Sequence, residues 1–149
     1  MKLNKFHLIA GGAVAAGAVL AFALPAGAAV TVQSQSPPAA TVKLGSTATL
    51  DANGAVVFAP VKVVCRPGQY ASLSVTVAEN VNGDIASGTT YQEIEQCDGT
   101  VQNLQVAVIP TQKAFKKGIA FGQAKLEYSG NNGYHTAVDQ HNIQIVERH

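Results

Sequence analysis

Six dipeptides that favour chain reversal punctuate this sequence at nearly even intervals. They are Asn53-Gly54, Pro67-Gly68, Asn82-Gly83, Asp98-Gly99, Lys117-Gly118 and Asn132-Gly133, and their glycines lie 14 to 19 residues apart. Glycine adopts the positive φ that tight turns need, and Asn or Asp before it tolerates the same region. The segments between the turns are rich in Val, Thr, Ile and Tyr, which favour strands. The spacing therefore predicts an all-β domain of about seven antiparallel strands.

The first residues carry the pattern of a secretory signal peptide. Lys2 and Lys5 precede an uncharged run over residues 8–24, and small residues follow it. We expect cleavage after Ala28, with Ala29 as the near alternative. No twin arginine precedes the apolar run, so we expect the general secretory route.

The alternative for this segment is an uncleaved membrane anchor. Its apolar run is near the lower end of the roughly 17–25 residues that a spanning helix uses, and it consists mostly of Ala and Gly. We therefore expect a signal peptide at 1–28, a polar Pro/Ser lead-in at 29–40 and a β domain at 41–149. After cleavage we expect no membrane attachment.

The composition of the remaining 121 residues fits one ordinary domain. Without Lys2 and Lys5 the chain has eight basic residues against nine acidic ones. A chain so close to neutrality has no broad basic surface, so nucleic acid is not an expected partner.

The two cysteines, Cys65 and Cys97, both remain after processing. An even cysteine count in an exported protein indicates a disulfide. A pair of reactive thiols or a metal-binding pair is the alternative, but there is no Cys-x-x-Cys spacing and neither cysteine has a histidine beside it.

The alternation of apolar and polar residues predicts where the strands lie and which faces are buried. The third segment is the clearest, because Ala71, Leu73, Val75 and Val77 share one face while Ser and Thr occupy the other. One dry face and one wet face are typical of a two-layer sandwich or a barrel wall. The predicted strands are 41–50, 55–65, 71–77, 85–96, 101–109, 119–129 and 134–146.

Three of these strands contain irregularities. Gly45 interrupts the first strand, which predicts a bulge or a switch between sheets. Pro60 cannot donate a ladder hydrogen bond, so we expect an open side or a bulge there. In the last strand Val138 has the opposite parity to Ile143 and Ile145, and this slip predicts a bulge between Val138 and Ile143.

The order of the strands places both cysteines at one end of the domain. In an up-and-down run the connections after the second, fourth and sixth strands share an end, and Cys65 and Cys97 close the second and fourth strands. In an immunoglobulin-like β-sandwich the second, fifth and fourth strands are neighbours, so the two cysteines are within reach of each other.

The pattern from residue 46 to residue 145 also resembles a known group of proteins. The stretches that carry the resemblance are VVFAPVKVVCRPG, ASLSVTVAEN and KAFKKGIAFGQAKL. They are similar in style to the small secreted immunoglobulin-like proteins of high-GC Gram-positive bacteria. The resemblance implies an all-β, immunoglobulin-like antiparallel sandwich in an extracellular protein.

The turns at the cysteine-bearing end are the candidate ligand-binding site. Loops at one end of a rigid β domain often carry recognition, and Tyr, Asn and Ser adapt well to partners. Ordinary solvated turns are the alternative. The candidate residues are Arg66, Tyr70, Asp98, Asn131, Asn132 and Tyr134. We expect a non-enzymatic module that binds an unknown extracellular protein or an envelope component, without a cofactor.

A metal-binding or catalytic function is the competing hypothesis. His135, Asp139 and His141 share parity on the last strand and could ligate a metal, although a bulge would break their alignment. Glu93 and Glu95 could act as acid–base carboxylates, but neighbouring carboxylates on a polar edge strand are more often solvated.

The connection over residues 111–118 suggests two further hypotheses. As the one long loop, it could project as the reactive segment of an inhibitor of secreted hydrolases. It also carries Lys113, Lys116 and Lys117, which could contact an anionic envelope polymer, whereas a solvated loop is the alternative.

Overall fold

The computed structural model describes residues 40–148, which form strands and one short 3-10 turn. The elements are β1 (Ala40–Leu44), β2 (Thr47–Asp51), η1 (Ala52–Gly54), β3 (Val56–Cys65), β4 (Ala71–Val81), β5 (Asp84–Ile94), β6 (Gln102–Val108), β7 (Gly118–Gly130) and β8 (Gly133–Glu147). The all-β prediction is confirmed. The expected signal peptide, and the lead-in before residue 40, lie outside the described residues. Within residues 40–148, no helix is long and apolar enough to cross a membrane.

The first predicted strand is two strands, β1 and β2, which separate at Gly45. The Gly45 N–H donates to the Pro60 carbonyl at 2.8 Å, and a Cβ at Gly45 would lie 2.6 Å from the Pro60 Cγ. β1 pairs antiparallel with β3, whereas β2 pairs antiparallel with β3 and parallel with β8. After the break the chain therefore keeps β3 as a partner and adds β8, so the interruption at Gly45 marks the place where the strand comes to join both layers.

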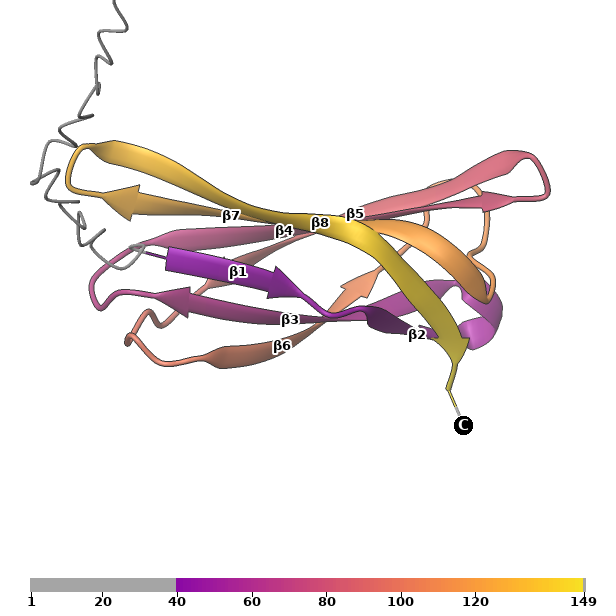
Figure 1. The fold of residues 1–149 in the computed structure, drawn as a ribbon, viewed down its shortest axis with the longest axis horizontal. Helices are drawn as coiled ribbons and strands as arrows, with labels where there is room; N and C mark the ends of the chain where they lie inside the picture. Colours follow the sequence, from indigo (N-terminus) through magenta and orange to yellow (C-terminus); the bar gives the residue numbers. More distant parts are fainter. Residues whose placement is uncertain (1–39, 149) are drawn as a thin grey trace, which may run out of the picture. The chain divides into compact units, whose positions relative to one another are not determined.

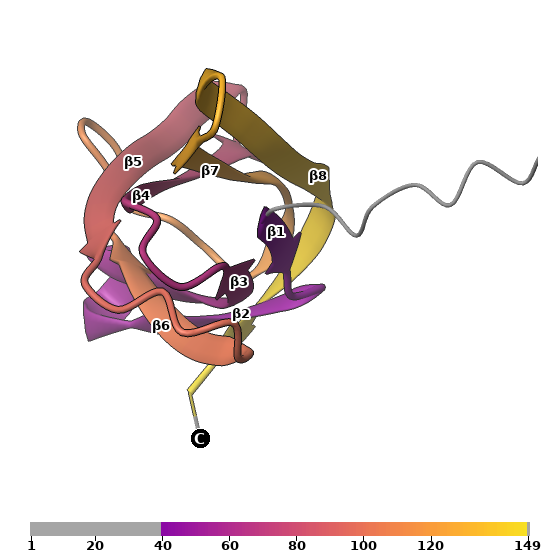
Figure 2. The same cartoon turned by 90° about the vertical axis from the view of Figure 1, so that its left-hand side faces the viewer.

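Hydrogen bonds join all eight strands into one sheet. The order is β1-β3-β2-β8-β7-β4-β5, and β6 pairs with the other edge of β3. Figures 1 and 2 show that this sheet folds back on itself, so that β5, β4, β7 and β8 lie across from β1, β3 and β6. We call the set of β5, β4, β7 and β8 the β5–β8 layer, and the set of β1, β3 and β6 the β1–β6 layer; each name gives the two outer strands of its layer.

The hydrophobic core fills the space between the two layers. Inward positions alternate along the strands as the sequence predicts: Val61 and Val63 of β3 and Leu73 and Val75 of β4 are all at most 1% exposed. Leu126 and Ile143 complete the β5–β8 side. Burial of this aliphatic surface provides the main driving force for folding.

The connection between β6 and β7 folds over one end of the core instead of projecting. Phe115 is 1% exposed, and its N–H donates to the Gly54 carbonyl at 3.0 Å. The buried Glu79 accepts a hydrogen bond from the Lys116 N–H at 2.8 Å. Gly54 has a φ of 91°, and a Cβ there would lie 2.1 Å from the Phe115 carbonyl oxygen, so the position requires glycine.

β5 and β6 meet without forming a regular ladder. The Thr111 N–H donates to the Ser87 carbonyl at 2.9 Å, and the Thr90 hydroxyl donates to the Ala107 carbonyl at 2.6 Å. A Cβ at Gly88 would lie 2.1 Å from the Ile109 carbonyl oxygen. Glycine therefore allows the two backbones to touch at this corner.

The bulge predicted in the last strand is wrong. The β7–β8 ladder keeps one register from Gly118 opposite Ile145 to Gly130 opposite Gly133. Val138 is simply an apolar residue on the outer face, where its side chain is 50% exposed. A single exposed valine on a sheet face is ordinary, so the parity of Val138 does not indicate a bulge.

The predicted disulfide is confirmed. Cys65 and Cys97 are bonded, with their Cα atoms 5.0 Å apart. Cys65 is fully buried, and its carbonyl accepts a hydrogen bond from the Gly99 N–H at 2.9 Å. The bond therefore ties the end of β3 to the segment that links β5 with β6.

Removal of the disulfide by the double substitution Cys65→Ala and Cys97→Ala should lower the free energy of unfolding by roughly 3–4 kcal/mol, because it frees a loop with a sequence separation of 32 residues. Urea denaturation of oxidised wild-type and variant proteins measures the difference. Equal stabilities would show that the bond does not constrain the unfolded chain.

Candidate functional site

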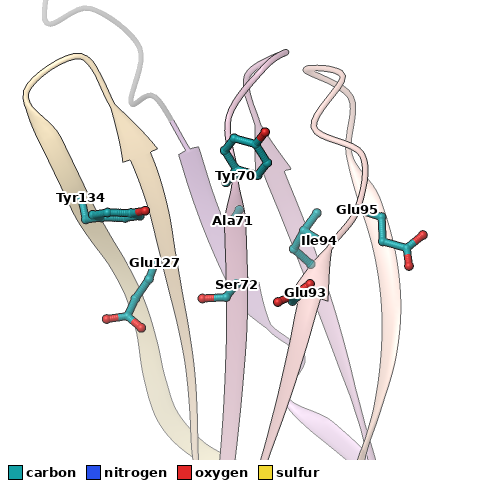
Figure 3. Close-up of a pocket in the computed structure, with 8 residues that line it drawn as sticks. All are labelled: Tyr70, Ala71, Ser72, Glu93, Ile94, Glu95, Glu127 and Tyr134. Carbon is teal, nitrogen blue, oxygen red and sulfur yellow. The ribbon is translucent and has the colours of Figure 1, made fainter.

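The outer face of the β5–β8 layer has a shallow depression of about 550 Å³ near the disulfide end. It is open to solvent, and tyrosines and carboxylates are prominent among the residues that line it (Figure 3). We call it the tyrosine–glutamate depression. Its lining residues are Tyr70, Ala71, Ser72, Glu93, Ile94, Glu95, Glu127 and Tyr134.

Strand register places two carboxylates of the depression on either side of Ser72. Ser72 of β4 lies directly opposite Glu93 of β5 on one side and opposite Glu127 of β7 on the other. Directly opposed residues of antiparallel strands have side chains on the same face, with Cβ atoms about 5 Å apart. Figure 3 shows these three residues at a similar level on neighbouring strands, with Tyr70 and Tyr134 nearer the loops.

The two tyrosines are held by Ser129. The Tyr70 N–H donates to the Ser129 hydroxyl at 2.9 Å, and the Ser129 N–H donates to the Tyr70 carbonyl at 2.9 Å. Tyr134 is the cross-strand partner of Ser129 in the β7–β8 ladder. The backbones of both tyrosines are therefore fixed, while each residue remains 82% exposed.

The depression has an excess of negative charge. The Glu127 carboxylate lies 3.0 Å from the Lys125 ammonium, and within the described residues Glu93 and Glu95 form no ion pair. Carboxylates and the faces of tyrosine rings both attract cations. The arrangement therefore favours a cationic group, and it offers an exposed aromatic rim for further contact.

Two of the six predicted binding residues, Tyr70 and Tyr134, line the depression. The other four do not. Arg66 lies in the β3–β4 turn, where its N–H donates to the Gln69 Oε1 at 2.8 Å. Asn131 and Asn132 form the exposed tip of the β7–β8 hairpin.

Asp98 supports a turn beside the disulfide. Its carboxylate accepts hydrogen bonds from the N–H and the hydroxyl of Thr100, at 2.8 and 2.7 Å. These hydrogen bonds, the backbone one foremost, hold the pKa of Asp98 below its ordinary value of 3.8. Asp98 therefore orders the segment that follows Cys97.

The lowered pKa of Asp98 predicts a pH effect on stability. The ionised carboxylate contributes fully above the unfolded pKa, near 3.8, and its contribution is lost as the pH falls through the lower folded pKa. Asp98→Asn, which cannot ionise, should show a smaller fall in melting temperature than the wild type between about pH 5 and about pH 2. Parallel falls in a thermal melt series would refute this role.

The three candidate metal ligands make contacts with different parts of the structure. Asp139 and His141 are neighbours, with the Asp139 Oδ1 3.6 Å from the His141 Nδ1. The other Asp139 oxygen accepts a hydrogen bond from the Leu44 N–H at 2.9 Å, while the His135 ring stacks on Tyr128 at 5.7 Å between centroids. Among residues 40–148, no three His, Cys, Asp or Glu side chains are grouped as metal ligands would be. Asp139 acts instead as a link between β8 and β1.

Asp139→Ala should lower the free energy of unfolding by about 1–3 kcal/mol, because it leaves the part-buried Leu44 N–H without its charged acceptor. Asp139→Asn keeps an acceptor oxygen and should cost less. Thermal melts with and without added zinc test the alternative, since a zinc-dependent rise that His141→Ala abolishes would indicate a metal site.

The carboxylates of the depression were not predicted as binding residues. The sequence indicates Glu93 and Glu95 only as possible acid–base carboxylates, and it gives no signal for a binding role of Glu127. One signal was available: the Asn82-Gly83 turn sets the β4–β5 register, which places Glu93 opposite Ser72. The contribution of Glu127 depends on the long-range β4–β7 pairing, which no local pattern specifies.

Comparisons with known proteins give no family for this chain. No protein-family model and no curated protein matches it. Among solved structures, it is similar to the sporulation control protein Spo0M of Bacillus subtilis, with a TM-score of 0.34 and 15% identity over 74% of this chain and 50% of that one. It is also similar to AggA, the major subunit of the aggregative adherence fimbriae type I of Escherichia coli, with a TM-score of 0.34 and 13% identity over 73% of this chain and 94% of that one. The chain thus spans half the length of the Spo0M chain, and at these TM-scores neither likeness assigns it a function.

Proposed function

We propose that this chain is a secreted, non-enzymatic binding module with an immunoglobulin-like arrangement of strands. The topology supports the arrangement, because β1, β3 and β6 form one layer, β5, β4, β7 and β8 form the other, and a broken first strand pairs with both. The signal-like N-terminus and the disulfide support secretion. We also propose, from the resemblance of the sequence, that the protein is one of the small secreted immunoglobulin-like proteins of high-GC Gram-positive bacteria.

The observation that carries the binding role is the pair of exposed tyrosines beside three carboxylates on a rigid sheet. Exposing an aromatic ring to water is unfavourable, and both Tyr70 and Tyr134 are 82% exposed. Tyrosine is enriched where proteins bind partners, because it offers a large contact area and loses little conformational entropy. The hydrogen bonds between Ser129 and Tyr70 fix the backbone before a partner binds, so less conformational entropy is lost on binding.

The charge of the depression indicates the kind of partner. Glu93 and Glu95 have no described cationic neighbour in an ion pair, and both line the depression. We therefore propose a partner that presents lysine or arginine side chains, or another organic cation, on an extracellular surface. An openly accessible depression suits such a surface better than it suits an enclosed small molecule.

The test is affinity capture from native envelope and culture fluid with oxidised wild-type protein and the variant Tyr70→Ala/Tyr134→Ala. Loss of two exposed interface tyrosines should reduce recovery of the specific partner at least about tenfold. Circular dichroism should be unchanged, because neither side chain contributes to the core.

Ile119→Ala is the matched control, because Ile119 is 68% exposed on the same layer but lies outside the depression. This variant should recover the partner as the wild type does. If the tyrosine variant and the control recover the partner equally well, binding does not use the depression.

A further inference from the structure

A second polar surface lies on the β1–β6 layer, away from the depression. Lys43 of β1 and Lys62 of β3 are direct cross-strand partners, and both are exposed. Their side chains therefore emerge on the same face with Cβ atoms about 5 Å apart. Like charges placed directly opposite each other on a sheet are destabilising.

No ion pair among the described residues offsets this repulsion. Within residues 40–148, neither Lys43 nor Lys62 forms an ion pair, whereas Lys113 pairs with Asp84 and Arg148 pairs with Asp51. On the other side of β3, the cross-strand partner of Lys62 is Asn103 of β6, which is neutral. An arrangement that costs stability and lacks an internal counter-ion indicates an external anion.

The two lysines border a groove of about 540 Å³. It is lined by Lys43, Leu44, Gly45, Pro60, Val61, Lys62, Asn103, Leu104 and Gln105. The groove crosses β1, β3 and β6, which is two strand spacings or about 10 Å. It therefore combines two positive charges, two amide side chains and the partly exposed ring of Pro60. We call it the lysine groove.

We propose that the lysine groove binds a linear polysaccharide that carries carboxylate groups. Lysine provides a charge without demanding a fixed geometry, which suits a repeating anion. The amides of Asn103 and Gln105 can both donate to and accept from sugar hydroxyls. The Pro60 ring provides an apolar surface for the C–H face of a sugar ring.

This site differs from the lysines of the β6–β7 connection. There Lys113 pairs with Asp84, and the Lys117 ammonium lies 3.9 Å from a Glu147 carboxylate oxygen. Those partners leave less free charge for a ligand. The lysine groove is also independent of the proposed function, because it shares no lining residue with the tyrosine–glutamate depression.

The experiment measures binding of the oxidised, exported protein to immobilised polygalacturonate at increasing salt. Wild-type protein should bind at low salt and lose affinity as salt rises. Lys43→Gln/Lys62→Gln should bind about tenfold more weakly. Its melting temperature should stay equal or rise, because the substitutions remove a like-charge pair, so weaker binding cannot reflect unfolding.

The matched control is Lys116→Gln/Lys117→Gln, which removes the same charge from the β6–β7 connection and should bind within about twofold of the wild type. Uncharged dextran should not bind. Four results would overturn the proposal: no binding to polygalacturonate, equal losses in both variants, a preference for polyglutamate over polygalacturonate, or salt-sensitive self-association in ultracentrifugation that only Lys43→Gln/Lys62→Gln abolishes. The last result would assign the groove to a second copy of the chain.

Discussion

The hydrogen bonding of β2 on both of its edges is the constraint on which the rest of the structure depends. Its antiparallel ladder with β3 and its parallel ladder with β8 connect the two layers through the backbone. The gain of β8 as a second partner follows an interruption of the strand at Gly45, where only a residue without a side chain fits against Pro60. Once this connection forms, the inward aliphatic residues of both layers face one another and exclude water.

The two proposed binding surfaces follow from that arrangement. A layered β domain has two outer faces, and here they differ in chemistry. The β5–β8 layer places Glu93 and Glu127 on either side of Ser72, whereas the β1–β6 layer places Lys43 opposite Lys62. A module with such faces could hold an anionic polymer on one side while it presents its tyrosines to a second partner on the other.

The sequence predicted the parts of the fold that depend on local chemistry. Turn glycines located the strands, alternation located the core, and strand order located the disulfide. The features that it missed depend on contacts between distant segments. Phe115 lies in a polar connection, yet it is buried because Gly54 is nearby in space. The Lys43–Lys62 pair exists only through the β1–β3 register, and the predicted bulge failed because an exposed Val138 looked like a core residue.

The close contact at Gly88 has a consequence for the exposed edges of the sheet. Where β5 meets the Ile109 carbonyl, the chain itself covers a strand margin that would otherwise be free to recruit another polypeptide. β2 does the same for the last residues of β8 on the opposite side. At these two places the backbone of the chain itself therefore occupies the strand edge, and at the first this depends on the absence of a side chain at residue 88.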